Sequence, residues 1–217
     1  MKALLTGLIL LAALALLPAC EDDPSFDCID CGWTFSQIER MPLTSRRAIL
    51  NNIEYAYKTR RGDVLGELLD DNFAFYFDPS DVGGEIPPFW GRDEEYETTR
   101  ALFESNTVSV PLGPVCRSIR VDVQYNDGTE WAPVVPASAP TETWYTATVG
   151  YSYTFEMEPD NTYISQNGAQ SQFTVRQVGD EWRLVEWRDL GASMMNAIGS
   201  GAEVSETTWG SIKALYR

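Results

Sequence analysis

Residues 145–157, YTATVGYSYTFEM, decide the fold because large apolar and small polar side chains alternate along them. One face of this stretch carries Tyr145, Ala147, Val149, Tyr151, Tyr153, Phe155 and Met157. The opposite face carries Thr146, Thr148, Ser152, Thr154 and Glu156. A period of two over this length predicts a long β-strand with one face buried in a core.

Further strands are predicted on either side of this stretch. Residues 119–125 alternate in the same way, and Phe173 and Val175 lie on the strand that follows. Gly179-Asp180 predicts a hairpin turn. In the last strand, Trp182 and Leu184 are expected on one face and Val185 and Trp187 on the other. A strand that is apolar on both sides should be central in the sheet or covered on both faces.

Helical patterns come before these strands. A helix capped by Thr44 or Ser45 should run to residues 60–62, where two arginines precede a glycine, and a short second helix should follow from Asp63. A third is predicted over residues 93–104, with an inner stripe of Tyr96, Thr99 or Arg100, and Phe103. A terminal helix capped by Ser205 should present Trp209, Ile212, Leu215 and Tyr216 on one face. Helices followed by long antiparallel strands indicate the α+β class.

Several short motifs resemble the nuclear transport factor 2-like family, which includes ketosteroid isomerase and the SnoaL-type polyketide cyclases. They are IEYAY at 53–57, RGD at 61–63, LLDDNF at 68–73, FDP at 77–79, FWGR at 89–92 and GDEWRLVEWRD at 179–189. The resemblance covers about residues 44–190. It implies a curved antiparallel sheet wrapped around N-terminal helices, with a conical pocket for a small molecule. A shared fold alone assigns no chemistry.

The same resemblance supplies candidate site residues. Ketosteroid isomerases use a tyrosine on the first helix and a proton-moving aspartate that precedes a proline, and here Tyr55 and Asp78 lie at matching positions. The structural alternatives are a helix residue at the pocket rim for Tyr55 and a turn-capping carboxylate for Asp78. Asp122 is the nearest counterpart of the family's third catalytic group. Trp90 follows a proline-rich loop and is expected at the pocket mouth.

Residues 1–20, MKALLTGLILLAALALLPAC, have the pattern of a lipoprotein signal peptide. A basic start precedes an apolar run, and LPAC at 17–20 resembles the lipobox of bacterial lipoproteins. The run is near the lower limit of about 17 residues for a membrane span. The resemblance implies that Cys20 carries acyl chains such as palmitate and becomes the first mature residue. The protein is then anchored to a bacterial membrane in the cell envelope, facing the periplasm or the exterior.

These patterns divide the chain into four parts. Residues 1–19 are the expected signal peptide, and residues 20–42 are a polar tether and lead segment. Residues 43–191 form the expected nuclear transport factor 2-like domain, and residues 192–217 form a C-terminal extension with a short helix.

Composition limits the function. The formal net charge is −16, which argues against nucleic acid as a partner. The chain has no histidine, so Ser–His and Cys–His nucleophilic pairs are excluded and a zinc site would lack ligands. No phosphate-binding glycine loop occurs. We therefore expect no metal and no cofactor.

Three cysteines remain after lipidation: Cys28, Cys31 and Cys116. In an oxidising compartment, a local Cys28–Cys31 bridge and a bridge from this lead segment to Cys116 are both open. Either bridge leaves one thiol unpaired.

Together these observations favour a membrane-anchored module that binds a small apolar or amphipathic ligand, or a partner protein, without catalysis. The first alternative is a cofactor-free isomerase or cyclase that uses Asp78 and Tyr55. The second is a scaffold that forms a homodimer through its exposed sheet.

The anchor can be tested by replacing Cys20 with serine. A serine at this position cannot be lipidated, so the Cys20→Ser protein should leave the membrane fraction, whereas the wild type stays there. Membrane fractionation with a carbonate wash, followed by mass spectrometry of the N-terminus, checks this. A serine variant that still sediments with membranes would show that the assignment of the anchor is wrong.

Overall fold

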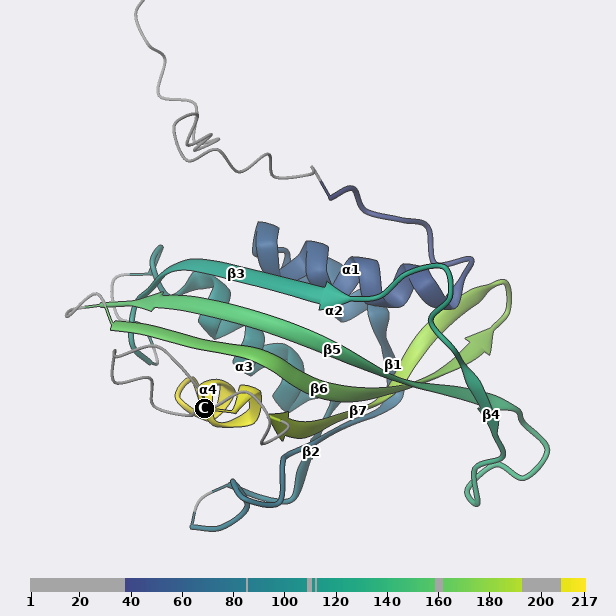
Figure 1. Ribbon diagram of the computed structural model, residues 1–217. Coiled ribbons are helices and arrows are strands. Elements are labelled where there is room, and N and C mark those ends of the chain that lie inside the picture. Colours follow the sequence, from purple (N-terminus) through teal and green to yellow (C-terminus); the bar gives the residue numbers. More distant parts are fainter. Residues whose placement is uncertain (1–37, 85, 109–110, 112, 159–161, 193–207) are drawn as a thin grey trace, which may run out of the picture. The chain divides into compact units, whose positions relative to one another are not determined.

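Seven strands form one curved, unclosed sheet in a computed structural model that describes residues 38–217 except 85, 109–110, 112, 159–161 and 193–207 (Figure 1). The strand order is β2-β1-β7-β6-β5-β3, and β4 also pairs with β5. The strands are β1 Leu69–Tyr76, β2 Phe89–Gly91, β3 Cys116–Gln124, β4 Ala132–Val134, β5 Trp144–Met157, β6 Thr162–Val178 and β7 Glu181–Ala192. All pairs are antiparallel except β1–β7, which is parallel.

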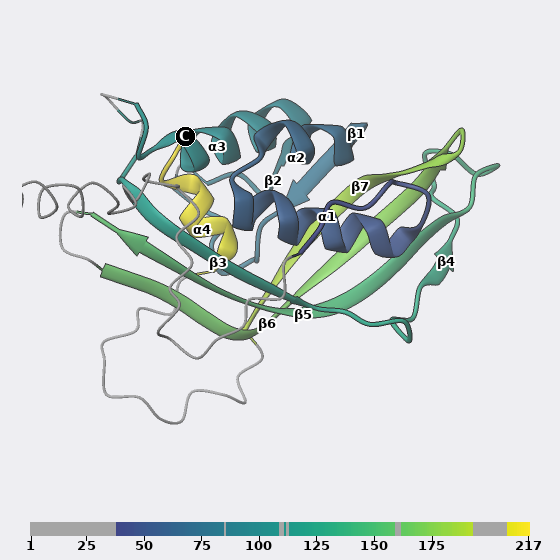
Figure 2. The ribbon, with the colours of Figure 1, turned by 90° about the horizontal axis from the view of Figure 1, so that it is seen from above.

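In the described part of the chain four helices accompany the sheet: α1 Arg46–Thr59, α2 Gly62–Leu68, α3 Arg92–Glu104 and α4 Trp209–Ala214. Figure 2 shows all four on the same side of the long strands, which bend around them. The structure therefore confirms the predicted α+β class, with a curved sheet wrapped around N-terminal helices.

The long strand β5 follows the predicted pattern. The residues from Ala147 to Met157 that were assigned to the inner face are buried, and Tyr145 is partly buried. Strand β6 pairs with β5 through Phe173 opposite Ala147, and β7 follows the turn at Gly179, whose φ is +62°. This register puts the aromatic side chains of three neighbouring strands into one core.

Because of a β-bulge at Val185, the residues of β7 that share a face differ from those predicted. The pairing with β6 shifts by one residue between Val175, opposite Leu184, and Thr174, opposite Glu186. Because the extra residue resets the alternation, Leu184 and Trp187 both join the main core, whereas they were expected on opposite faces. Val185 is also buried, and β7 lies between β1 and β6, so the prediction of a central or covered strand is confirmed.

Helix α1 begins and ends close to its predicted limits. The side chain of Ser45 accepts a hydrogen bond from the backbone N–H of Ala48 at 3.2 Å. At the other end Arg60, rather than a glycine, adopts the left-handed conformation, with φ of 53°. The Arg60 guanidinium donates to the carbonyl oxygens of Phe103 and Cys116, and these contacts hold a backbone conformation that non-glycine residues rarely adopt.

Other elements depart from the sequence predictions. β1 begins at Leu69, directly after α2 ends at Leu68, so Asp70 to Asn72 belong to a strand. Asp63 lies in the first turn of α2, which Arg61 precedes as the N-terminal flanking residue.

The terminal helix also differs from its prediction. Thr208 caps α4, and the predicted cap Ser205 lies outside the described residues. Leu215 is 45% exposed, although it was expected on the same face as Trp209, which is buried, and Lys213 is buried as well.

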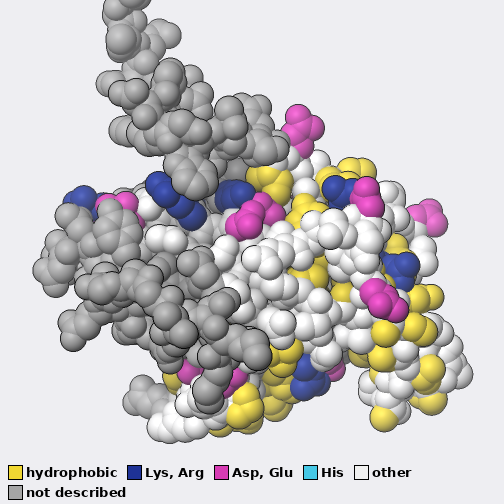
Figure 3. All heavy atoms as spheres, viewed as in Figure 1, with side chains coloured by type: hydrophobic (Ala, Val, Ile, Leu, Met, Phe, Trp, Pro, Cys, Tyr) yellow, Lys and Arg dark blue, Asp and Glu magenta, His cyan; other side chains and the backbone are white. Residues whose placement is uncertain are grey.

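Charged side chains of both signs are interspersed on the face that Figure 3 displays. No helix among the described residues is long and apolar enough to cross a membrane.

The sheet register predicts which truncations unfold the protein. Trp187 and Tyr151 are 2% and 3% exposed. Replacing either with alanine should lower the free energy of unfolding by about 3–5 kcal/mol, because a buried aromatic ring is lost and a cavity remains. Leu190→Ala is the matched control on β7, since this exposed side chain should matter by less than about 0.5 kcal/mol. Denaturant titration measures all three; losses below ~1 kcal/mol at both aromatic positions would contradict the register.

Candidate functional site

The interior, where the sequence predicts a conical pocket, is filled by α4. Trp209 is buried, and its ring packs against aromatic rings from α1, β5 and β7. The centroid distances are 4.8 Å to Tyr57, 5.1 Å to Tyr153, 5.6 Å to Phe155, 5.7 Å to Tyr151 and 5.7 Å to Trp187. The segment assigned from sequence to a C-terminal extension therefore contributes a central part of the core.

A buried ion pair lies beside this ring. Lys213 Nζ is 2.6 Å from Glu95 Oε1, and the two side chains are 1% and 0% exposed. The ammonium also lies over the rings of Phe75 at 3.9 Å and Trp187 at 4.2 Å. A cation removed from water requires such partners, because its desolvation is costly.

Glu95 is held in place by two further donors. Trp90 Nε1 donates to Oε2 at 3.0 Å, and the Thr99 hydroxyl donates to Oε1 at 3.3 Å. The hydroxyls of Tyr57 and Thr99 lie 3.4 Å apart, which extends the network to α1. Both carboxylate oxygens of Glu95 are thus satisfied inside an aromatic environment, as a buried charge must be.

Burial changes the acidity of these groups. It lowers the pKa of Lys213, although the negative charges of Glu95 and Asp189 oppose that shift. It raises the pKa of Tyr57 well above 10, and the charge of Glu95 adds to this effect. Tyr57 therefore remains a neutral phenol.

A second buried carboxylate, Asp189, fixes the start of α4. It accepts hydrogen bonds from the Tyr151 hydroxyl at 3.0 Å and from the backbone N–H groups of Gly191 and Gly210 at 3.1 Å each. Burial raises the pKa of Asp189, and these donors partly oppose the shift. A side chain at Gly210 would lie 2.5 Å from the ring of Phe77, so only glycine fits there.

Asp81 makes a further link to α4, because the hydroxyl of Thr208 donates to its carboxylate. Burial is the main cause that raises the pKa of Asp81, and the nearby charge of Asp78 adds to it.

The structure does not bring the predicted catalytic pair into this network. Tyr55 is half-buried on α1, whereas its neighbour Tyr57 faces the interior. Asp78 accepts hydrogen bonds from the backbone N–H and the hydroxyl of Ser80, which is the turn-capping role. Among the described residues, no hydrogen bond joins Tyr55 to Asp78. Asp122, the remaining candidate, is exposed on β3.

Trp90 lies in the core rather than at a pocket mouth. Its ring contacts Phe75 and Phe77 at centroid distances of 5.8 and 4.6 Å, and its indole N–H binds Glu95. The sequence around Trp90 does not reveal that its indole N–H binds Glu95 in the core.

The lipidation candidate Cys20 and the disulfide candidates Cys28 and Cys31 lie outside the described residues. Cys116 is buried, and its thiol donates to the carbonyl of Ser118 at 3.3 Å. Burial raises the pKa of Cys116 to about 11, so its thiolate is scarce at neutral pH. In the part of the chain that the structure describes, no three acidic or cysteine side chains gather in a way that would hold a metal ion.

Glu95, Lys213 and Asp189 were missed as interior residues. Glu95 lies four residues before Thr99, which the sequence analysis placed on the inner stripe of the third helix, so it shares that face. Lys213 lies four residues after Trp209 in the same way. An acidic residue on one inner face and a basic residue on another could have indicated the pair.

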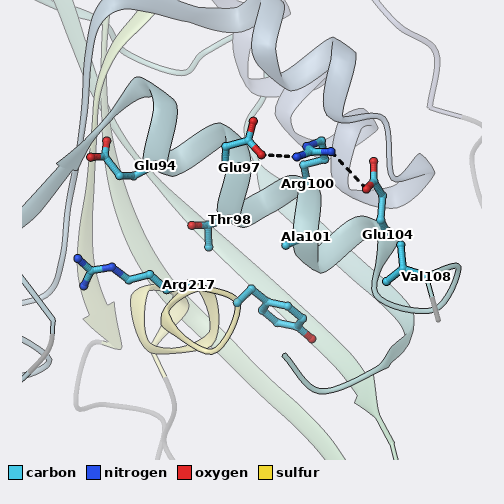
Figure 4. Close-up of a pocket in the computed structure, with 9 residues that line it drawn as sticks. Glu94, Glu97, Thr98, Arg100, Ala101, Glu104, Val108 and Arg217 are labelled. Carbon is cyan, nitrogen blue, oxygen red and sulfur yellow. Dashed lines mark hydrogen bonds and ion pairs between the residues drawn. The ribbon is translucent and has the colours of Figure 1, made fainter. Parts of the chain in front are cut away.

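An open groove of about 350 Å³ lies between α3 and the C-terminal residues (Figure 4). Glu97 and Glu104 both pair with Arg100 along its wall, and Glu94 accepts a hydrogen bond from the backbone N–H of Gly91. These three carboxylates are therefore engaged within α3 or with Gly91 just before it.

Comparison with known proteins gives similarity at the level of structure only. The sequence matches no family description and no curated protein. Similar solved structures include a nuclear transport factor 2-like superfamily protein from Salmonella enterica, with 11% identity, a TM-score of 0.46, and coverage of 71% of this chain and 92% of that chain. A conserved protein from Planctomyces limnophilus has 15% identity, a TM-score of 0.46, and coverage of 66% and 90%. A hexachlorocyclohexane dehydrochlorinase from Novosphingobium barchaimii has 7% identity, a TM-score of 0.44, and coverage of 65% and 80%.

The ion pair should respond unequally to single and double substitution. Glu95→Gln and Lys213→Met should each lower the free energy of unfolding by about 3–5 kcal/mol, because each leaves one buried charge unpaired. The double variant should lose less than the sum of the two, since neither charge remains. Denaturant titrations of the four proteins measure this coupling. Additive losses would show that the two side chains do not interact.

Proposed function

We propose that this chain is a lipid-anchored protein of the bacterial envelope whose nuclear transport factor 2-like domain acts as a non-catalytic binding module. The observation that carries the proposal is that the body of the domain surrounds a charged and an aromatic side chain of α4, Lys213 and Trp209, with a carboxylate and aromatic rings. The arrangement resembles a ligand site in which the chain's own C-terminal helix takes the place of the ligand. The lipobox-like ending at Cys20 supports the location.

A catalytic site requires space for substrate next to a base and an anion-stabilising group. Rings and a buried ion pair occupy that space here. The Asp78 carboxylate accepts hydrogen bonds from Ser80 in its own turn, and Tyr55 is only partly buried, at the margin of the core. These contacts favour binding over the isomerase or cyclase alternative.

A dimeric scaffold is the second candidate. A domain whose interior is filled by its own side chains needs no ligand to complete its core, which suits a purely structural role. Native mass spectrometry of the Cys20→Ser full chain separates the two: a co-purified small molecule supports ligand binding, and a ligand-free dimer supports the scaffold.

A non-catalytic role predicts that Asp78 can be replaced with little effect on stability and none on turnover. Asp78→Asn keeps an oxygen that accepts from Ser80, so the free energy of unfolding should change by less than about 1 kcal/mol. Any turnover detected with the wild type in isomerase or cyclase assays should persist in this variant. Asp180→Asn, in the β6–β7 turn, is the matched surface control. A rate that falls by ~10²-fold or more only in Asp78→Asn would overturn the binding-module proposal, since that is the loss typical of a removed general base.

A further inference from the structure

The environment of Lys213 Nζ has the chemistry of an ammonium-binding cage. One side is the Glu95 carboxylate at 2.6 Å, and the others are the faces of Phe75 at 3.9 Å, Trp187 at 4.2 Å and Trp209 at 5.7 Å. Aromatic faces attract a cation through their quadrupoles, and the attraction grows when the cation is removed from water. A carboxylate with aromatic walls is therefore a recognition site for a positively charged nitrogen.

The cage is built almost entirely by residues outside α4. Phe75 lies on β1, Glu95 on α3 and Trp187 on β7, and only Trp209 comes from α4 itself. Glu95 is aimed by Trp90 and Thr99, which also belong to the body of the domain. Glu95, Phe75 and Trp187 therefore do not belong to the helix that carries the lysine.

Helix α4 has only six residues, which is too short for stable helix formation by itself. Its helical state depends on what it contacts in the interior. Lys213 and Trp209 are thus the groups by which this segment is recognised, as the charged and apolar parts of a ligand would be.

We propose that Glu95, Phe75 and Trp187 form a binding site for primary alkylammonium groups, and that Lys213 is its internal occupant. A primary ammonium is favoured because it has an N–H to donate to Glu95 while its remaining surface faces the rings. A quaternary ammonium has no such donor, and an alcohol has no charge. The inference rests on the proposed binding function and names the chemical group that this interior recognises, which in the wild type is the ammonium of Lys213 itself.

The test replaces the lysine side chain by a free amine in the full chain. Lys213→Ala removes three carbons and the ammonium, so n-propylammonium has the size and charge of the missing part. We expect the variant to have a lower Tm than the wild type. Propylammonium chloride should raise that Tm by at least ~4 °C, increasing with concentration as ligand linkage requires. The wild type should show no such rise, because Lys213 already fills its site.

Three controls test whether the site is specific for a primary ammonium group. Equal concentrations of 1-propanol and of tetramethylammonium chloride should fail to restore the Tm of Lys213→Ala. Propylammonium should also fail in Glu95→Gln/Lys213→Ala, which lacks the carboxylate. If Lys213→Ala has no cooperative transition, recovery of its near-ultraviolet circular dichroism on adding each compound is the measure. Equal effects of propylammonium and propanol, or an effect that persists without Glu95, would overturn the ammonium site.

This experiment is independent of the membrane fractionation of Cys20→Ser and of the turnover assays with Asp78→Asn. If propylammonium does not restore the Tm of Lys213→Ala, the ammonium site is wrong, and the proposed anchored binding module is unaffected. If a rate depends on Asp78, the non-catalytic module is wrong, whatever propylammonium does to the Tm.

Discussion

The ion pair between Lys213 and Glu95 is the interaction on which the organisation of the interior depends. Each charge is fully buried, so each requires the other, and together they join the C-terminal helix to α3. The rings of Phe75 and Trp187 complete the surroundings of the ammonium, and Trp90 and Thr99 complete those of the carboxylate. A buried pair of this kind adds little net stability compared with apolar residues, but it penalises strongly any arrangement that separates its members. Its main physical effect is to specify where α4 lies.

Apolar packing and backbone hydrogen bonds act with the pair at the two ends of α4. Trp209 stacks on Trp187 and contacts three aromatic side chains of β5. Asp189 accepts from the N–H of Gly210. At the other end the Tyr216 hydroxyl donates to the carbonyl of Pro114 at 2.8 Å. A curved sheet with helices on one side leaves a space near its middle, and these contacts show how this chain fills it.

The filled interior changes which residues matter for function. Tyr55 and Asp78 match a family pattern in sequence, yet one lies on the less buried side of α1 and the other closes a turn. Groups whose pKa values are shifted by burial include Lys213 on α4, and Tyr57 and Asp189 beside that helix. Such perturbation marks functional and structural sites alike. Here the cause is burial, and the partners are supplied by the chain itself.

The sequence by itself determined the class of the fold, because the patterns involved are local. Alternation from Tyr145 to Met157 depends only on the strand period, and the capping of α1 by Ser45 depends on residues within one turn. The face on which Trp187 lies was decided by the bulge at Val185, which arises from pairing with β6 and leaves no local mark. The position of Lys213 was decided by residues distant along the chain, Glu95 and Phe75 more than a hundred positions away and Trp187 nearer, which only tertiary packing brings to one point. A buried charge is stable only where distant partners meet it, and for that reason the interior site belongs to the tertiary structure.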